Sequence, residues 1–193
     1  MTAYAEPVRR PGPSAGWWGM AAFVAAESML FACLIGTYLY LRFKSAVWPP
    51  QGIPEPKVVL PLVLTGILLL TSAPMQLAAV AARRGRVGRT RALILLALAV
   101  QAAYFGVQVH EYAGDLGSFG PQANAYGSIY YVLLGADHAH VFVGLLFDVW
   151  LLLKLLGGLT TYRLRAVGAI AFYWHAVNVI TLAVVATELS ARI

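Results

Sequence analysis

Five long apolar segments constrain the fold of this 193-residue chain more than any other feature. They cover residues 17–41, 58–82, 92–109, 126–153 and 166–189. A helix needs about 20 residues to cross the hydrocarbon core of a bilayer. Because backbone N–H and C=O groups cannot stay unpaired in lipid, each segment must be helical. The sequence therefore predicts an all-α integral membrane bundle of five transmembrane helices.

The overall composition excludes two other classes of protein. Hydrophobic residues make up 60% of the chain and charged residues only 11%, whereas soluble domains have roughly 25% charged residues. The net charge of +6 comes from basic residues between the apolar segments, so it does not indicate a nucleic-acid partner. We expect a flexible cytoplasmic N-terminal segment, residues 1–16, followed by one transmembrane domain, residues 17–193.

The lysines and arginines are distributed unequally between the two sides of the predicted bundle. Four of the 14 basic residues lie on one side and ten on the other. The ten are Arg9, Arg10, Arg83, Arg84, Arg86, Arg89, Arg91, Lys154, Arg163 and Arg165. Since loops rich in Lys and Arg stay in the cytoplasm, this pattern predicts a cytoplasmic N-terminus and an external C-terminus.

The sequence predicts a structural role for two residues inside the apolar segments. Pro74 should kink the second helix, because proline removes one backbone hydrogen bond and clashes with the preceding turn. Cys33 is the single cysteine and is expected to be a small residue of the helix packing core.

Glu27 is the clearest candidate for a functional residue. It follows Trp17 by ten residues, which places it about 15 Å along the first helix, near the middle of the membrane. Its neighbours one helical turn away are apolar and offer no partner. A carboxyl in hydrocarbon costs at least about 2.5 kcal/mol, so it needs a position that faces protein. Two interpretations stand side by side: a protonatable site, or a neutral acid that hydrogen bonds a backbone carbonyl.

The fourth segment carries a continuous polar face. Its members Asp137, His140, Gly144 and Asp148 are spaced by three, four and four residues, which aligns them along one side of a helix. His138 points elsewhere. We expect this face to pack against another helix or subunit, with Gly144 allowing close approach.

The third and fifth segments also contain polar side chains. Gln108 and Glu111 lie on one face of the third helix near its outer end, and His175 and Asn178 lie three residues apart in the fifth. All four are candidates for hydrogen bonds between helices, a common role for polar side chains in membranes.

Recognisable catalytic motifs are missing from the sequence. There is no nucleophile elbow, phosphate-binding loop, zincin pair or haem attachment motif. A metal site built from Asp137, His138, His140 and His175 is conceivable, but His138 and His140 cannot share one helical face. We expect no catalytic residue, cofactor or metal in this chain.

Several segments resemble one family, the third subunit of cytochrome c and quinol oxidases. Residues 18–31, WGMAAFVAAESMLF, are similar to that family's helix with a buried, carbodiimide-reactive carboxylate, and Glu27 occupies its position. Residues 105–112, FGVQVHEY, match the family pattern with Gln108 and Glu111. Residues 126–131, YGSIYY, with His140, Val141 and Gly144 further on, and residues 173–178, YWHAVN, complete the resemblance in the family's order.

The chain departs from the family pattern at three positions and in its length. Asp137 stands where a first histidine is usual, Leu134 where threonine is usual, and Asn178 where aspartate is usual. Any role of that first histidine cannot be carried over. Many members have seven helices, so this chain resembles the short five-helix bacterial version.

The resemblance implies a non-catalytic subunit III of a haem-copper terminal oxidase in aerobic electron transport. It implies packing against oxidase subunit I, with subunit II in the same complex, and support of proton uptake at the oxygen-reducing site. Haem and copper would lie in the partner subunits. Structural phospholipids would lie between its helices, the location would be the bacterial plasma membrane, and a larger respiratory supercomplex could include it.

Three alternatives remain open from the sequence. The complex could be a quinol oxidase or an assembly with a nitric oxide reductase, since related subunits share these motifs. The chain could instead be a stand-alone membrane metalloenzyme. A small proton-coupled transporter that uses Glu27 ranks last, because five helices give no inverted repeat.

Overall fold

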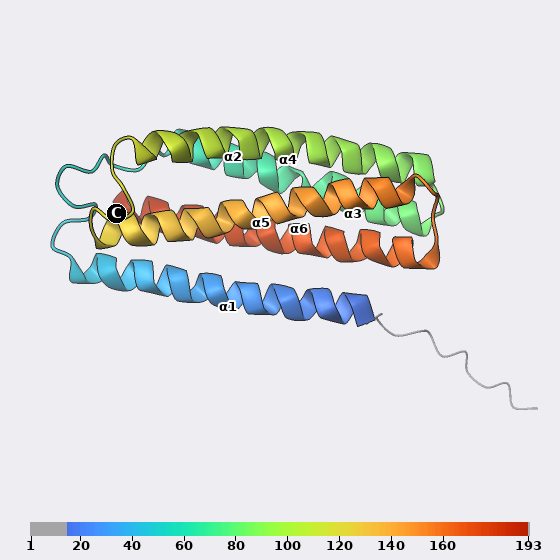
Figure 1. The fold of residues 1–193 in the computed structure, drawn as a ribbon, viewed down its shortest axis with the longest axis horizontal. Coiled ribbons are helices and arrows are strands. Elements are labelled where there is room, and N and C mark those ends of the chain that lie inside the picture. The colour runs from blue at the N-terminus through green and yellow to red at the C-terminus, as the bar shows by residue number, and fades with distance from the viewer. Residues whose placement is uncertain (1–14, 193) are drawn as a thin grey trace, which may run out of the picture.

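The computed structural model describes residues 15–192, and its helices lie side by side along one direction (Figure 1). Five described segments are long and apolar enough to cross a membrane, so the prediction of an all-α membrane bundle with five spans is confirmed. The helices are α1 (Ala15–Lys44), α2 (Val59–Leu70), α3 (Ser72–Arg83), α4 (Val87–Leu116), α5 (Ala125–Leu155) and α6 (Thr161–Leu189), followed by a short 3-10 helix, Ser190–Arg192. The expected N-terminal segment falls outside the described residues as far as residue 14.

The second span consists of two consecutive helices, α2 and α3. α2 ends at Leu70 and α3 begins at Ser72, with Thr71 between them. Pro74 lies three residues beyond the break. Its ring nitrogen cannot donate to the carbonyl of Leu70, so the regular ladder is interrupted there. The expected effect of Pro74 is therefore seen as a break in the helix just before this residue.

The helices extend beyond the apolar segments that predicted them. α4 begins at Val87 and ends at Leu116, so it includes Arg91 at one end and Glu111 at the other. Long charged side chains can extend from a helix end towards the membrane surface. The Arg91 guanidinium donates hydrogen bonds to the carbonyl of Leu155, which lies at the end of α5. The hydropathy pattern could not reveal these extra turns.

Polar side chains begin the last two helices. Asn124 Oδ1 accepts a hydrogen bond from the backbone N–H of Gly127 at 2.9 Å, and Thr160 Oγ1 accepts one from Arg163 at 3.3 Å. Both residues have an extended backbone, as an N-cap requires. These caps fix where α5 and α6 start.

α1 lies at the edge of the bundle and packs against α5 and α6 (Figure 1). Only 6% of its most apolar window is buried, compared with 50% for α6. Cys33 is exposed on this helix, so its assignment to the packing core was wrong. A helix with neighbours on one side can bury only a narrow stripe of its residues.

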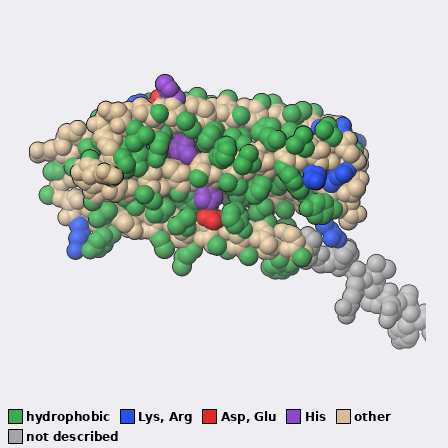
Figure 2. All heavy atoms as spheres, viewed as in Figure 1, with side chains coloured by type: hydrophobic (Ala, Val, Ile, Leu, Met, Phe, Trp, Pro, Cys, Tyr) green, Lys and Arg blue, Asp and Glu red, His purple; other side chains and the backbone are tan. Residues whose placement is uncertain are grey.

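The surface agrees with a membrane location. Figure 2 shows apolar side chains across the middle of the molecule and Lys and Arg side chains gathered near its two ends. Charged groups at both ends with an apolar band between them are what a bilayer requires.

Candidate functional site

Glu27 of α1 pairs with His140 of α5. The distance between Glu27 Oε2 and His140 Nε2 is 3.1 Å, and the two side chains are 25% and 14% exposed. The ring of Phe31 packs edge-on against the imidazole, with centroids 5.1 Å apart. In Figure 2 an acidic side chain touches a histidine near the middle of an apolar face. The structure thus brings together two of the predicted site residues.

Hydrogen bonding decides where the protons of this pair can be. His140 Nδ1 lies 2.7 Å from the carbonyl oxygen of Ala136, which can only accept, so Nδ1 carries a hydrogen. His140 Nε2 is then the ring atom that faces Glu27 Oε2. The pair therefore joins a carboxyl group and an imidazole near the middle of the bundle.

The polar face of α5 packs against α1 and α6. Asp137 Oδ1 accepts a hydrogen bond from Thr181 Oγ1 at 2.7 Å. Asp148 Oδ2 accepts one from the indole N–H of Trp174 at 2.9 Å. Gly144 lies between these contacts, where an added Cβ would be 2.6 Å from the Trp174 ring. Gly144 therefore provides the close approach that the spacing suggests.

Gln101 connects this face to the break in the second span. The amide orientation that satisfies both ends has Nε2 donating to Asp148 Oδ2 at 2.9 Å. Its Oε1 then accepts from Thr71 Oγ1 at 3.3 Å. Gln101 and Asp148 are both fully buried. Buried polar groups need hydrogen-bond partners. These bonds therefore fix the position of the helix break relative to α4 and α5.

Asn178 and His175 also contact the second span. Asn178 Nδ2 donates to Ser72 Oγ at 2.7 Å and to the carbonyl of Leu68 at 3.3 Å. His175 Nε2 lies 3.2 Å from Gln76 Oε1. Neither residue contacts Glu27 or His140. Their positions fit bonds between helices more directly than a role at the Glu27–His140 pair.

Gln108 and Glu111 lie apart from that pair, towards the α4–α5 loop. Gln108 Nε2 donates to the hydroxyl of Tyr104 at 2.9 Å. The Glu111 carboxylate forms an ion pair with Lys57, and this hydrogen bond raises the pKa of Lys57. Both residues line a cavity at this end of the bundle. The sequence analysis did not predict that cavity. Glu188, an acid at the end of the last apolar segment, was the one sequence signal for a polar site there.

A second hollow lies at the other end, between α1, α5 and α6. Its volume is about 720 Å³, and its walls are mostly apolar side chains, including Met20, Phe147 and Trp150. Arg165 also lines it. An apolar groove with a cation at one end suits an acyl chain with an anionic headgroup.

Metal binding gains no support from the geometry. Within residues 15–192, no three His, Cys, Asp or Glu side chains form a group that could hold a metal ion. His138 and His140 bind different neighbours, since His138 Nδ1 contacts the carbonyl of Leu134. The candidate ligands considered for a metalloenzyme are not brought together.

Comparison with known proteins extends over nearly the whole chain. The family model described as cytochrome c oxidase subunit III matches residues 14–187. Cytochrome c oxidase subunit 3 of Thermostichus vulcanus is 31% identical, over 84% of this chain and 80% of the relative. The corresponding protein of Corynebacterium diphtheriae is 32% identical, over 84% and 81%. The cytochrome bo(3) ubiquinol oxidase subunit 3 of Pseudomonas aeruginosa is 29% identical, over 88% and 80%.

Proposed function

The chain belongs to the cytochrome c oxidase subunit III family, and we propose that it stabilises the catalytic first subunit of a haem-copper terminal oxidase and supports proton uptake there. As a subunit III it is a multi-pass membrane protein of a multisubunit oxidase. The single observation that carries this function is the family match over residues 14–187. Subunits I and II are its proposed partners, with haem and copper bound in them, and the bacterial plasma membrane is its proposed location.

The Glu27–His140 pair supports the part of the proposal that concerns protons. It joins a carboxyl group to an imidazole, lies near the middle of α1 and α5, and is partly exposed on the bundle surface. A group that faces outwards at this depth can contact a neighbouring subunit. Ionisable residues inside a membrane generally mark proton or ligand pathways.

The groove near Arg165 supports the binding of structural phospholipids. Its apolar walls suit acyl chains, and the Arg165 guanidinium suits a phosphate oxygen. Replacing Arg165 with glutamine should lower the amount of phospholipid that copurifies with the complex. Arg89→Gln is a matched control, because Arg89 is exposed and does not line the groove.

The electron donor has two candidates. Relatives named for cytochrome c and for ubiquinol match this chain at similar identity. A pull-down of the tagged chain from native membranes in mild detergent, with a reduced-minus-oxidised spectrum, tests the assignment. Haem bands with a large catalytic subunit are expected. A copper-containing second subunit would indicate cytochrome c, and a colourless protein without partners would contradict the proposal.

Glu27→Gln tests the proton role directly. Glutamine keeps the shape and can still donate a hydrogen bond to His140, but it cannot release a proton. The complex should assemble, and proton uptake by the reconstituted oxidase should slow by at least about twofold, because positioned side chains accelerate proton transfer. Ser28→Ala, at the exposed neighbouring position, should leave uptake unchanged. Loss of the assembled complex in Glu27→Gln would instead make the pair structural.

A further inference from the structure

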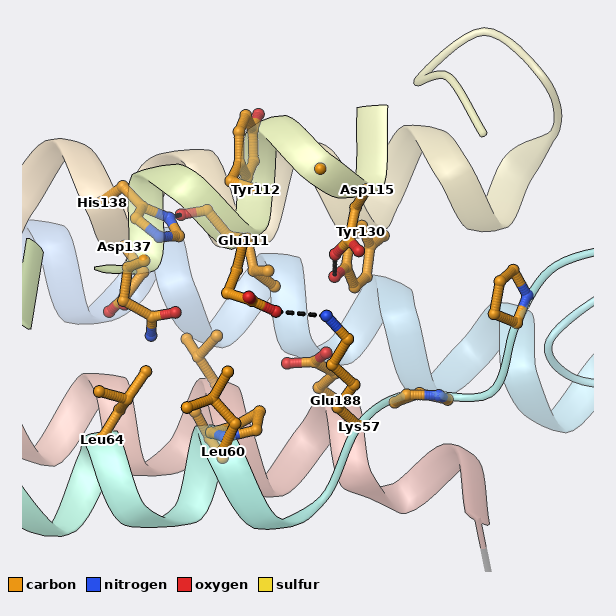
Figure 3. A pocket seen from close by; sticks show the side chains of 18 of the residues that line it. Lys57, Leu60, Leu64, Glu111, Tyr112, Asp115, Tyr130, Asp137, His138 and Glu188 are labelled. Atoms are coloured by element: carbon orange, nitrogen blue, oxygen red, sulfur yellow. Dashed lines mark hydrogen bonds and ion pairs between the residues drawn. The ribbon is translucent and has the colours of Figure 1, made fainter. Parts of the chain in front are cut away.

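A cavity of about 450 Å³ lies at the α4–α5 loop end of the bundle (Figure 3). It begins beside Lys57, whose side chain is 62% exposed, and it reaches Asp137. Asp137 is the thirteenth residue of α5, which begins at Ala125, so it lies about 18 Å along the helix. Figure 3 shows Asp137 towards one end of the view and Lys57 and Glu188 nearer the other, with Glu111 between them. The cavity thus leads from the loop to the middle of the bundle.

Five carboxyl side chains, those of Glu55, Glu111, Asp115, Asp137 and Glu188, are among the residues that line this cavity. Besides Asp137 and Glu188, its charged and titratable lining residues come from three elements: Glu55 and Lys57 from the loop before α2, His110, Glu111, Tyr112 and Asp115 from α4, and Tyr126, Tyr130 and His138 from α5. Lys57 pairs with Glu111, and the Tyr130 hydroxyl donates to Asp115 Oδ2 at 2.6 Å. The Lys57 ammonium group is therefore already paired with Glu111 and does not neutralise Asp137 or Glu188.

Glu188 is the acid for which the described residues supply no partner. It is 7% exposed, lines the cavity and has no side-chain hydrogen bond or ion pair within residues 15–192. Asp137 is 4% exposed, and one of its oxygens is bonded to Thr181. A buried carboxylate without a compensating charge is costly. A cation, a proton or hydrogen bonds from water must therefore compensate it.

Two observations favour protons carried by water. The described residues offer no three-ligand group for a metal ion. The cavity also has polar side chains in its lining, and it is far larger than the roughly 15 Å³ of probe volume that one water requires. Water can therefore reach Glu188 and Asp137, and bonds from water satisfy a carboxylic acid as well as a carboxylate.

We propose that this cavity is a water-filled proton-binding site in which Glu188 and Asp137 exchange protons with the aqueous phase at the α4–α5 loop end of the bundle. In uptake, a hydronium ion gives its proton to a carboxylate oxygen and becomes water; release is the reverse. The charge pattern predicts that this end faces the outside of the cell. The site is separate from the Glu27–His140 pair, because neither of those residues lines this cavity.

Asp148 provides an internal control. It is fully buried on the same helix as Asp137 and bonded to Trp174, but it does not line the cavity. If burial alone governed proton exchange, all three acids would behave alike. If access through the cavity governs proton exchange, the Asp148 proton exchanges more slowly than those of Asp137 and Glu188.

The test is infrared spectroscopy of the purified oxidase complex during transfer from H₂O to D₂O. The C=O bands of protonated acids are assigned by their loss in Asp137→Asn, Glu188→Gln and Asp148→Asn. We expect the Asp137 and Glu188 bands to shift at least about tenfold faster than the Asp148 band, because exchange of a sealed group requires opening of the structure. Equal rates, or no protonated band for either cavity acid, would overturn the proposal.

A variant that retains all the acids gives a second measurement. Leu60 is half-buried and lines the cavity, so Leu60→Trp should fill part of it and slow the shift of the Asp137 band by at least about tenfold, because the remaining route requires local opening. Leu62→Trp is the matched control, since Leu62 is 48% exposed and does not line the cavity. An unchanged Asp137 rate in an assembled Leu60→Trp complex would also overturn the proposal.

Discussion

The contact between Gly144 and Trp174 makes residue 144 sensitive to a single added carbon. A Cβ there would lie 2.6 Å from one ring atom and 2.9 Å from another. Gly144→Ala should therefore displace the indole and weaken its hydrogen bond to Asp148. Overpacking of this kind costs about 1–3 kcal/mol.

Thermal unfolding of the detergent-purified complex, followed by circular dichroism, measures this effect. Gly144→Ala should unfold at a lower temperature than wild type. Gly168→Ala is the control, because a Cβ at position 168 would meet no atom within 4 Å. If both variants unfold at the wild-type temperature, the Trp174 contact does not constrain the helix packing.

At the residue scale the sequence could locate Glu27 but not its partner. The apolar surroundings of Glu27 and its depth in the membrane could be predicted from the sequence, since both depend on neighbours in the same helix. His140 lies 113 residues away in the chain, and its approach depends on how α1 packs against α5. The polar face of α5 was likewise predictable from spacing, whereas its bonds to Thr181 and Trp174 require the tertiary arrangement.

At the element scale, Asn178 links α6 to the interrupted second span. Its amide donates to Ser72 and to the Leu68 carbonyl, which lies near the helix break. Asn178→Leu should destabilise the bundle by about 0.6–2 kcal/mol, the range found for polar contacts between membrane helices. Val179→Leu is the control, because Val179 is 66% exposed.

The measurement for Asn178 is hydrogen–deuterium exchange of the backbone amides around the break. The amides of residues 68–73 and 75 should exchange faster in Asn178→Leu and at the wild-type rate in Val179→Leu. Unchanged exchange in both variants would mean that Pro74 and Thr71 determine the break without help from α6.

The hydropathy pattern predicted that the helices exist, but it did not predict where they begin and end. The five apolar segments predicted five spans because burial in lipid demands continuous apolar helices. The ends depend on capping by Asn124 and Thr160 and on charged residues that extend α4 at both ends. Those features lie in polar sequence, where an apolar window carries no signal.

At the scale of the whole molecule, the charge pattern predicts which end of the bundle faces the cytoplasm. In a Cys33→Ala background, a cysteine at Arg86 should react with an impermeant maleimide only after the membrane is opened. A cysteine at Ser118, in the exposed α4–α5 loop, should react in intact cells. The reverse labelling pattern would place the proton-binding cavity on the cytoplasmic side.

The position of α1 has a consequence for the synthesis of the chain. α1 is made before α5 and α6, yet these two later helices are its packing partners. Until α5 has been made, α1 must stay in the lipid with its Glu27 carboxyl lacking the His140 imidazole. α1 therefore joins the bundle late, because both of its packing partners follow it in the chain.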